Sequence, residues 1–335
     1  MHIGKSYTFS EFLDWTRRDI YVLIVLAVVP VVAYEVADLR WLAIPWTVVA
    51  MLGTATAFIV GFKNLQTYNR TWEARQIWGD IISSSRAWGT TSRDFFSNPE
   101  KSKELIYRHF AWLTAMRYQM RDTRAWETTG KAHNVEYQRF YSIPEKETAL
   151  ETELAKYLSP GELRPVLAAT NKPAQILGLQ SNTIKGLFAR QEIVVLQFVD
   201  MQRSIKEFFV QHGRSERIKD FPYPRQFAVI SSFFVKLFCL LLPFGLLREF
   251  DRLNENVEGV MEGNMIWLVI PFSVLISWMY TSLDRVGEST ESPFEGSAND
   301  VPISQMCRAV EVDLREMLGE TDLPPLLQPR NNIVL

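Results

Sequence analysis

The chain has 335 residues, a formal net charge of −2 and a hydrophobic share of 47%. This composition excludes a disordered or fibrous chain, and the lack of a basic excess argues against a nucleic-acid-binding protein. Two cysteines, Cys239 and Cys307, are too few for a disulfide framework and fit a soluble part that faces a reducing compartment. A mean hydropathy of −0.05 is too polar for a protein that lies wholly within a membrane, but it permits a few spanning helices beside a polar part.

The apolar residues concentrate in four runs that contain almost no charge. About 20 helical residues cross the roughly 30 Å of a bilayer core, so the last three runs are long enough to span it. The first run is short unless Trp15 and Thr16 extend it or the bilayer thins locally. Buried helices of a soluble protein are the alternative, although four such runs in one chain are unusual there. The runs are residues 20–34, 41–62, 226–247, which includes Lys236, and 264–283.

Basic residues flank these runs unequally, and this indicates an orientation. The two short loops inside the pairs of runs hold only Arg40, Arg248 and Arg252, whereas the termini and the long insert hold the rest. The positive-inside rule therefore predicts that both termini and the insert are cytoplasmic. The expected partition is a cytoplasmic N-terminal segment 1–19, transmembrane helices 1 and 2 in 20–70, a helical cytoplasmic domain 71–225, transmembrane helices 3 and 4 in 226–283, and a cytoplasmic C-terminal segment and tail 284–335.

The insert has the apolar spacing of helices, so we expect an all-α chain. Ser159, Pro160 and Glu162 form a capping-box start with proline at the first helical position. Asn171 and Pro173 mark a second start, which we expect to open one long helix that runs towards Val210. A helical stripe of apolar residues follows late in the chain, at residues 306–317. Residues 122–144 are expected to form a long loop, and 323–335 an irregular tail.

The sequence carries no pattern typical of an enzyme. It has no Walker loop, no G-x-G-x-x-G and no G-x-S-x-G motif. The four histidines are scattered, without the spacing of a zinc site. We therefore expect no enzyme, no cofactor and no metal site, although a membrane-anchored hydrolase stays an alternative. The histidines are His2, His109, His133 and His212.

Three residues of the second apolar run, Thr54, Phe58 and Phe62, recur every four residues. Each step turns a helix by about 400°, so the three side chains share one face. Several copies of this helix around an axis would form a narrow apolar neck, and such constrictions gate by dewetting. The alternative is an ordinary aromatic contact within one subunit, and spacing alone favours this alternative.

The residues that follow this run, 61–79, resemble the signature of the bestrophin family. Bacterial members carry a G-F-[KR]-x-N-x-[AST]-Y-x-R-x-W-E-A-R-x-x-W-G run, and residues 290–294 and 299–302 resemble the family's segment after the fourth span. The resemblance covers nearly the whole chain. The matching motif residues are Gly61, Asn64, Tyr68, Arg70, Trp72, Glu73, Arg75, Trp78 and Gly79.

The resemblance implies a homopentameric ion channel in the bacterial inner membrane, whose second helix lines a central pore. The neck positions then map onto Thr54, Phe58 and Phe62, and Thr54 departs from the usual apolar residue, which should make the outer ring wider or wetter. A second, cytoplasmic constriction maps near Ile176 or Leu177, for which plain helix core is an equal alternative. The implied partners are other copies of the chain, membrane lipid and permeant ions, and no nucleic acid.

Animal members of the family are opened by calcium held in an acidic cluster after the fourth span. The corresponding acids here are Glu291, Glu295 and Asp300, interrupted by uncharged residues. Calcium prefers six to eight oxygen ligands, so the clasp looks degraded and we expect no such gating. Asp300 is expected to cap the following helix instead.

The charges give conflicting indications of the permeant ion. The outer loop, residues 248–263, has five acids against two bases, a net −3 per subunit, which would concentrate cations at a pore mouth. Lys63 below the neck, and phenyl edges facing the axis, would favour anions. We expect anions, chiefly chloride, with a cation (sodium) channel and a non-conducting scaffold or signalling protein as alternatives. The ion-attracting candidates are Lys63, the intramembrane Lys236, Glu255, Glu258 and Glu262.

Overall fold

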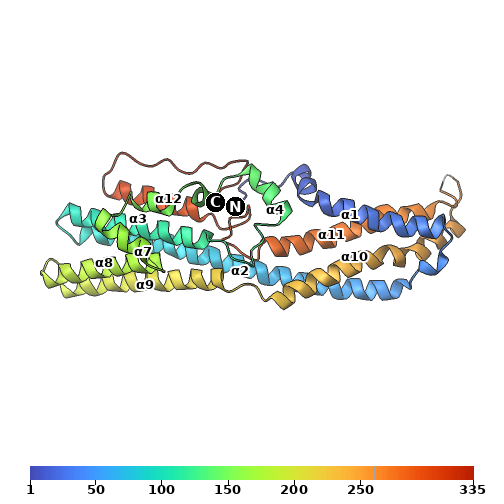
Figure 1. Cartoon of the computed structure of the whole chain (residues 1–335), viewed down its shortest axis with the longest axis horizontal. Helices are drawn as coiled ribbons and strands as arrows, with labels where there is room; N and C mark the ends of the chain where they lie inside the picture. The colour runs from blue at the N-terminus through green and yellow to red at the C-terminus, as the bar shows by residue number, and fades with distance from the viewer. Residues whose placement is uncertain (260) are drawn as a thin grey trace. The chain divides into compact units, whose positions relative to one another are not determined.

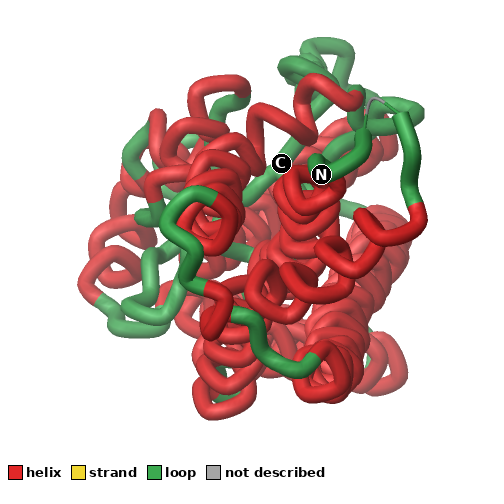
Figure 2. The backbone as a smooth tube through the Cα atoms, turned by 90° about the vertical axis from the view of Figure 1, so that its right-hand side faces the viewer, coloured by secondary structure: helices red, strands yellow, loops and turns green. Residues whose placement is uncertain are grey.

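The computed structural model describes residues 1–259 and 261–335, and within them it contains helices and no strands (Figure 1). The expectation of an all-α chain is therefore confirmed. Figure 2 shows how loops connect the helices. The helices are α1 (Phe9–Glu35), η1 (Arg40–Leu42), α2 (Trp46–Asp94), α3 (Pro99–Arg121), α4 (Ala132–Tyr137), η2 (Gln138–Phe140), α5 (Pro144–Glu147), α6 (Leu150–Leu154), α7 (Pro160–Ala168), α8 (Lys172–Ala189), α9 (Val195–Asp220), α10 (Arg225–Leu253), η3 (Asn254–Asn256), η4 (Met265–Leu268), α11 (Val269–Ser289) and α12 (Ile303–Met317).

The chain divides into two compact units. The first, called here the insert unit, comprises residues 1–4, 70–222 and 292–335. The second, called the apolar unit, comprises residues 5–69 and 223–291. Each unit has a core of its own.

Close helix packing builds the apolar unit, in which α1, α10 and α11 pack against one another. Small residues also let α2 approach α10 closely. A Cβ at Gly53 would lie 2.7 Å from the Phe238 ring, and one at Gly245 would lie 2.7 Å from a Val49 methyl. Small residues at such contacts let helix backbones approach closely in lipid.

Three segments of the described chain are long and apolar enough to cross a membrane: Arg40–Asp94, Arg225–Leu253 and Met265–Ser289. Helix α1 is not among them, because Asp19 and Glu35 bound its 15-residue apolar run. It is nevertheless 27 residues long and includes Trp15 and Thr16. Its role as a fourth span stays a prediction.

An aromatic cluster from α2, α3 and α9 lies in the core of the insert unit. The Phe208 ring lies 4.9 Å from that of Trp112, 4.7 Å from that of His109 and 5.8 Å from that of Trp88. The His109 imidazole bonds Ser85 at 2.8 Å. Burial lowers the pKa of His109 to about 3, so the ring is neutral and serves packing.

The expected helix from Asn171 towards Val210 is wrong, because the chain reverses between α8 and α9. Gln191 adopts φ 60°, its N–H donates to Phe188 O at 2.9 Å, and Glu192 N donates to Leu187 O at 3.0 Å. These bonds form a Schellman motif, which satisfies the last carbonyls of α8. Glycine usually occupies the left-handed position, and glutamine in its place hid the boundary from the sequence.

Two further local expectations have different outcomes. The capping box of α7 is confirmed, since Ser159 N and Oγ donate to Glu162 at 3.1 and 2.7 Å. The expected loop at 122–144 is wrong in part, because it contains α4 and η2.

Candidate pore-lining face

Helix α2 carries one face that its own subunit leaves uncovered. Thr54 is exposed, and the exposed fractions of Phe58 and Phe62 are 76% and 51%. Val60 and Thr67, on the opposite face, are buried. The structure therefore brings the three expected neck residues together on one open face, and a contact within the subunit, the alternative reading, involves Phe62 but leaves it half exposed.

Two side chains of this face have contacts within the subunit. Thr54 Oγ1 donates to Ala50 O at 2.9 Å, so its hydroxyl hydrogen is used within the helix. The Phe62 ring lies 6.3 Å from that of Phe227, in the first turn of α10. The face is thus mainly aromatic, with one hydroxyl oxygen open to other donors.

Lys63 points away from this face and is only 4% exposed. Its Nζ lies 2.9 Å from Asp284 Oδ1, and Ser231 Oγ donates to the same oxygen at 3.0 Å. The positive charge is therefore neutralised inside the apolar unit. Sequence reasoning found the lysine but not this carboxylate, which lies 221 positions further along the chain.

The first motif residues pack α2 closely against α11. Asn64 Nδ2 donates to Leu283 O at 3.0 Å, and a Cβ at Gly287 would lie only 2.2 Å from Asn64 Oδ1. Gly61 has open space around it, and Tyr68 is 58% exposed.

The later motif residues fix α2 within the insert unit. Arg70 donates to the carbonyls of Ile218 and Phe221 at the end of α9. A cation near the last carbonyls of a helix stabilises it. The remaining contacts are the ion pair between Glu73 and Arg217, the Arg75 guanidinium 5.9 Å from the Trp72 ring, and the buried Trp78 ring 6.2 Å from that of Phe294, while Gly79 faces open space.

The two candidates for a cytoplasmic constriction lie in the core of the insert unit. Ile176 and Leu177 are each 0% exposed. A side chain that lines a pore between subunits is exposed in a single subunit. Their burial supports the alternative that both are helix core. Gln175 and Gly178, beside them on α8, are exposed.

The other charged candidates are exposed in the apolar unit. Lys236 lies on α10 and acts electrostatically on Asp19, which also pairs with Arg285 at 2.6 Å. Glu255, Glu258 and Glu262 are exposed in the connection between α10 and α11.

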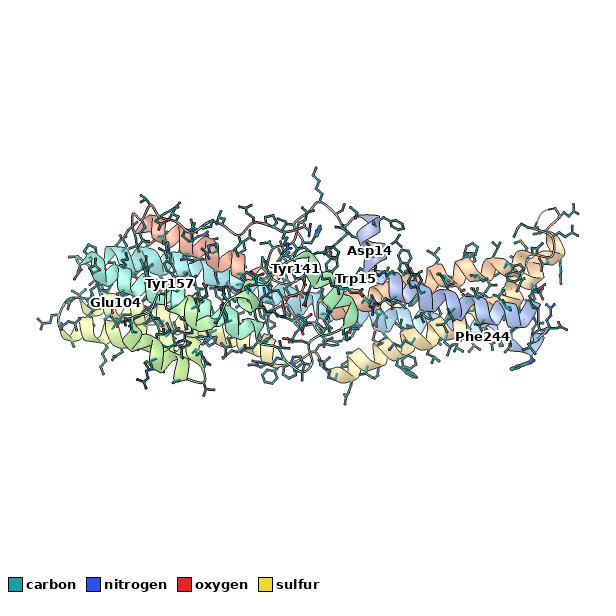
Figure 3. All side chains as sticks on the ribbon, turned by 45° about the horizontal axis from the view of Figure 1, so that its top comes forward. Asp14, Trp15, Glu104, Tyr141, Tyr157 and Phe244 are labelled. Carbon is teal, nitrogen blue, oxygen red and sulfur yellow. The ribbon has the colours of Figure 1, made fainter. Side chains whose placement is uncertain are left out.

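Asp300 does not cap α12, whose N-cap residue is Pro302, so that expectation is wrong. Its carboxylate instead accepts from Gly296 N at 2.7 Å and from Ser297 Oγ, and it lies 3.4 Å from Arg121 Nη1. A residue from another segment also binds this turn: the Tyr141 hydroxyl donates to Gly296 O at 3.1 Å (Tyr141 is labelled in Figure 3). Asp300 thus organises a turn rather than a helix start.

Two carboxylates of this turn are buried near one another. Glu295 accepts from the N–H and hydroxyl of Thr128, each at 2.8 Å. Burial, and next the charge of Asp300, raise the pKa of Glu295 to about 8, and burial raises that of Asp300. Among the described residues, no group of three or more His, Cys, Asp or Glu is arranged to hold a metal ion. The Arg121 guanidinium provides the positive charge beside Asp300.

Comparison with known proteins gives a consistent result. A family model described as bacterial/fungal bestrophin protein matches residues 14–316. A relative from Escherichia coli K12, named voltage-dependent anion channel-forming protein YneE, is 26% identical over 280 residues, or 84% of this chain and 79% of the relative. Another, sll1024 of Synechocystis, has the same descriptive name and is 22% identical over 269 residues, or 79% and 74% of the two chains.

A solved structure shares the fold. The crystal structure of a bacterial bestrophin homologue from Klebsiella pneumoniae superposes with a TM-score of 0.74 at 23% identity, covering 91% of this chain and 98% of that chain.

Proposed function

Because the chain belongs to the bacterial and fungal bestrophin family, we propose that it is an anion channel of the bacterial inner membrane, built as a homopentamer around α2. The observation that carries the proposal is the uncovered face of α2, with Phe58 and Phe62 exposed and the opposite face buried. The names of the curated relatives support anion conduction. They also favour a channel over an enzyme.

In the proposed assembly, Thr54, Phe58 and Phe62 from each subunit form three stacked rings around the axis. Two aromatic rings make a narrow apolar neck, which conducts when water enters and closes when it leaves. Thr54 would add an oxygen acceptor to the outer ring. Both termini and the insert unit would lie in the cytoplasm.

The preference for monovalent anions such as chloride would arise at the neck itself. Lys63 is paired with Asp284, so it supplies no free positive charge. Phenyl rings that turn their positive edges to the axis would attract anions instead. The exposed Glu255, Glu258 and Glu262 favour cations if they face the axis, which supports the alternative of a sodium-conducting homologue.

A second constriction in the insert unit stays a proposal. The expected residues, Ile176 and Leu177, are core, so an exposed neighbour on the same turn, Gln175, is the better candidate to face an axis.

Flux through liposomes tests the proposed function. We expect purified protein to release chloride, and Phe58→Ala and Phe62→Ala to raise the rate several-fold because each widens the neck. Val60→Ala, a truncation on the buried face of the same helix, is the matched control. Reversal potentials across a salt gradient then separate anions from cations. Folded protein that gives no flux would contradict the channel and support the alternative of a non-conducting scaffold. Equal flux in all variants would contradict the proposal that Phe58 and Phe62 form the neck.

A further inference from the structure

A basin of about 650 Å³ opens at the end of the apolar unit where α1 leads into η1 and α10 into η3. Ile44 N donates to Phe244 O at 3.2 Å and holds the α1–α2 connection against α10 (Phe244 is labelled in Figure 3). This contact gathers all three arginines of the two hairpin connections around one space. The charged and hydroxyl-bearing residues of the lining are Tyr34, Arg40, Arg248, Asp251, Arg252 and Glu255.

Asp251 organises one side of the basin. Its Oδ2 accepts from the Tyr34 hydroxyl at 2.8 Å and lies 3.3 Å from Arg40 Nη1. Arg40 is further held by Asp38 at 2.8 Å and stacks 4.6 Å from the centre of the Tyr34 ring. One guanidinium is therefore oriented in advance by partners from separate segments.

The other two arginines are held less firmly. Arg252 meets Glu249 only at 3.7 Å, and both side chains are largely exposed. Arg248 is exposed, and no ion pair involves it within residues 1–259 and 261–335. The lining itself has three arginines against Asp251 and Glu255, but Asp38 and Glu249 outside it pair with Arg40 and Arg252, so the positive charge that is left to a ligand is that of Arg248. The basin thus presents one guanidinium without an ion pair among the described residues, beside two that carboxylates hold in place.

Size and location indicate the class of ligand. A basin of about 650 Å³ is far larger than a monatomic anion needs, and planar guanidinium forks match phosphate oxygens. Trp41, in η1, and Trp46, the first residue of α2, are 77% and 36% exposed at this same end. Tryptophans enrich at the headgroup level of a bilayer. We propose that the basin binds a phosphate-bearing group, supplied by the headgroup of a membrane phospholipid.

Binding by the full-length protein in detergent tests this proposal. The probes are dihexanoyl-phosphatidylglycerol, dihexanoylglycerol, which lacks the phosphate, and free glycerol 3-phosphate, each titrated calorimetrically. The variants are Arg248→Gln, Arg248→Lys and Glu255→Gln. Arg203→Gln is the matched control, since it removes the same charge from an exposed position in the insert unit.

We expect the phosphatidylglycerol to bind and Arg248→Gln to weaken it about tenfold or more, because a charge-assisted contact to phosphate is lost. Arg248→Lys should restore part of the affinity, Glu255→Gln should raise it, and Arg203→Gln should leave it unchanged. If free glycerol 3-phosphate binds equally well and responds equally to Arg248→Gln, the site takes a soluble phosphate and the lipid source is overturned. Equal binding by Arg248→Gln and Arg203→Gln, or equal binding of dihexanoylglycerol, would overturn the site.

Discussion

At the scale of single residues, the functional argument rests on the difference in burial between the two faces of α2. Phe58 and Phe62 are exposed, whereas Lys63, adjacent in sequence, is buried with Asp284. A periodic pattern could predict which side chains share a face. It could not predict that Lys63 has a carboxylate partner, because no local rule links two positions 221 residues apart.

The buried pair gives the first prediction. Lys63→Met or Asp284→Asn alone should lower the stability of the protein by about 3–5 kcal/mol, because each leaves a buried charge uncompensated. The double variant should recover much of this loss. Apparent Tm values in detergent check it, with Arg190→Met, which breaks an exposed pair with Glu192, as the control. Additive losses in the double variant would show that the two charges do not compensate one another.

Glu295 gives a pH-dependent prediction. Its pKa rises from 4.5 to about 8 in the folded protein, where it lies near Asp300, Glu127 and Thr128. The folded state therefore holds the proton more tightly, so the stabilisation is fully present below pH 4.5 and is lost as the pH rises through about 8.

We expect Glu295→Gln to flatten the decline of apparent Tm between about pH 6 and pH 9, since glutamine does not ionise, while its oxygen can accept from Thr128 N–H and its amide group can donate to the Thr128 hydroxyl oxygen. Glu151→Gln, at an exposed position, should keep the slope of the wild type. An unchanged slope in Glu295→Gln would assign the decline to other groups.

At the scale of the elements, the apolar spacing predicted which segments are helical. The ends of the helices were predictable only where a local sequence signal marks them. The capping box at Ser159 and Glu162 could be predicted because both partners lie within one turn of the chain. The end of α8 could not, because Gln191 takes a left-handed conformation that glycine usually marks. The turn around Asp300 was misassigned to α12 because its partner Arg121 comes from a distant helix.

Close packing of α11 on α2 gives a prediction with an internal control. Gly287→Ala should destabilise the protein, because its Cβ would lie 2.2 Å from Asn64 Oδ1. Gly79→Ala, in α2 with open space, should be neutral or stabilising by up to about 1 kcal/mol from helix propensity. Apparent Tm values of both variants decide it. A loss in Gly79→Ala as large as in Gly287→Ala would remove the packing explanation.

At the scale of the whole molecule, the family motif predicted the fold, and the structure and the comparisons confirm that prediction. The motif residues themselves mostly hold helices together, as Arg70 does at the end of α9. The ion path is a proposal about several copies of the chain. A single sequence indicates this ion path only through the face of α2 that each copy leaves exposed.

Substituted-cysteine accessibility in liposomes tests the central claim most directly. Methanethiosulfonate reagents modify the thiolate, which forms where water is present, and the native Cys239 and Cys307 are only 3% and 8% exposed. We predict that a charged reagent reacts with Phe58→Cys and Phe62→Cys and changes the current, while Val60→Cys, on the buried face, does not respond. Conducting protein in which Phe58→Cys and Phe62→Cys are as inert as Val60→Cys would contradict a water path along α2.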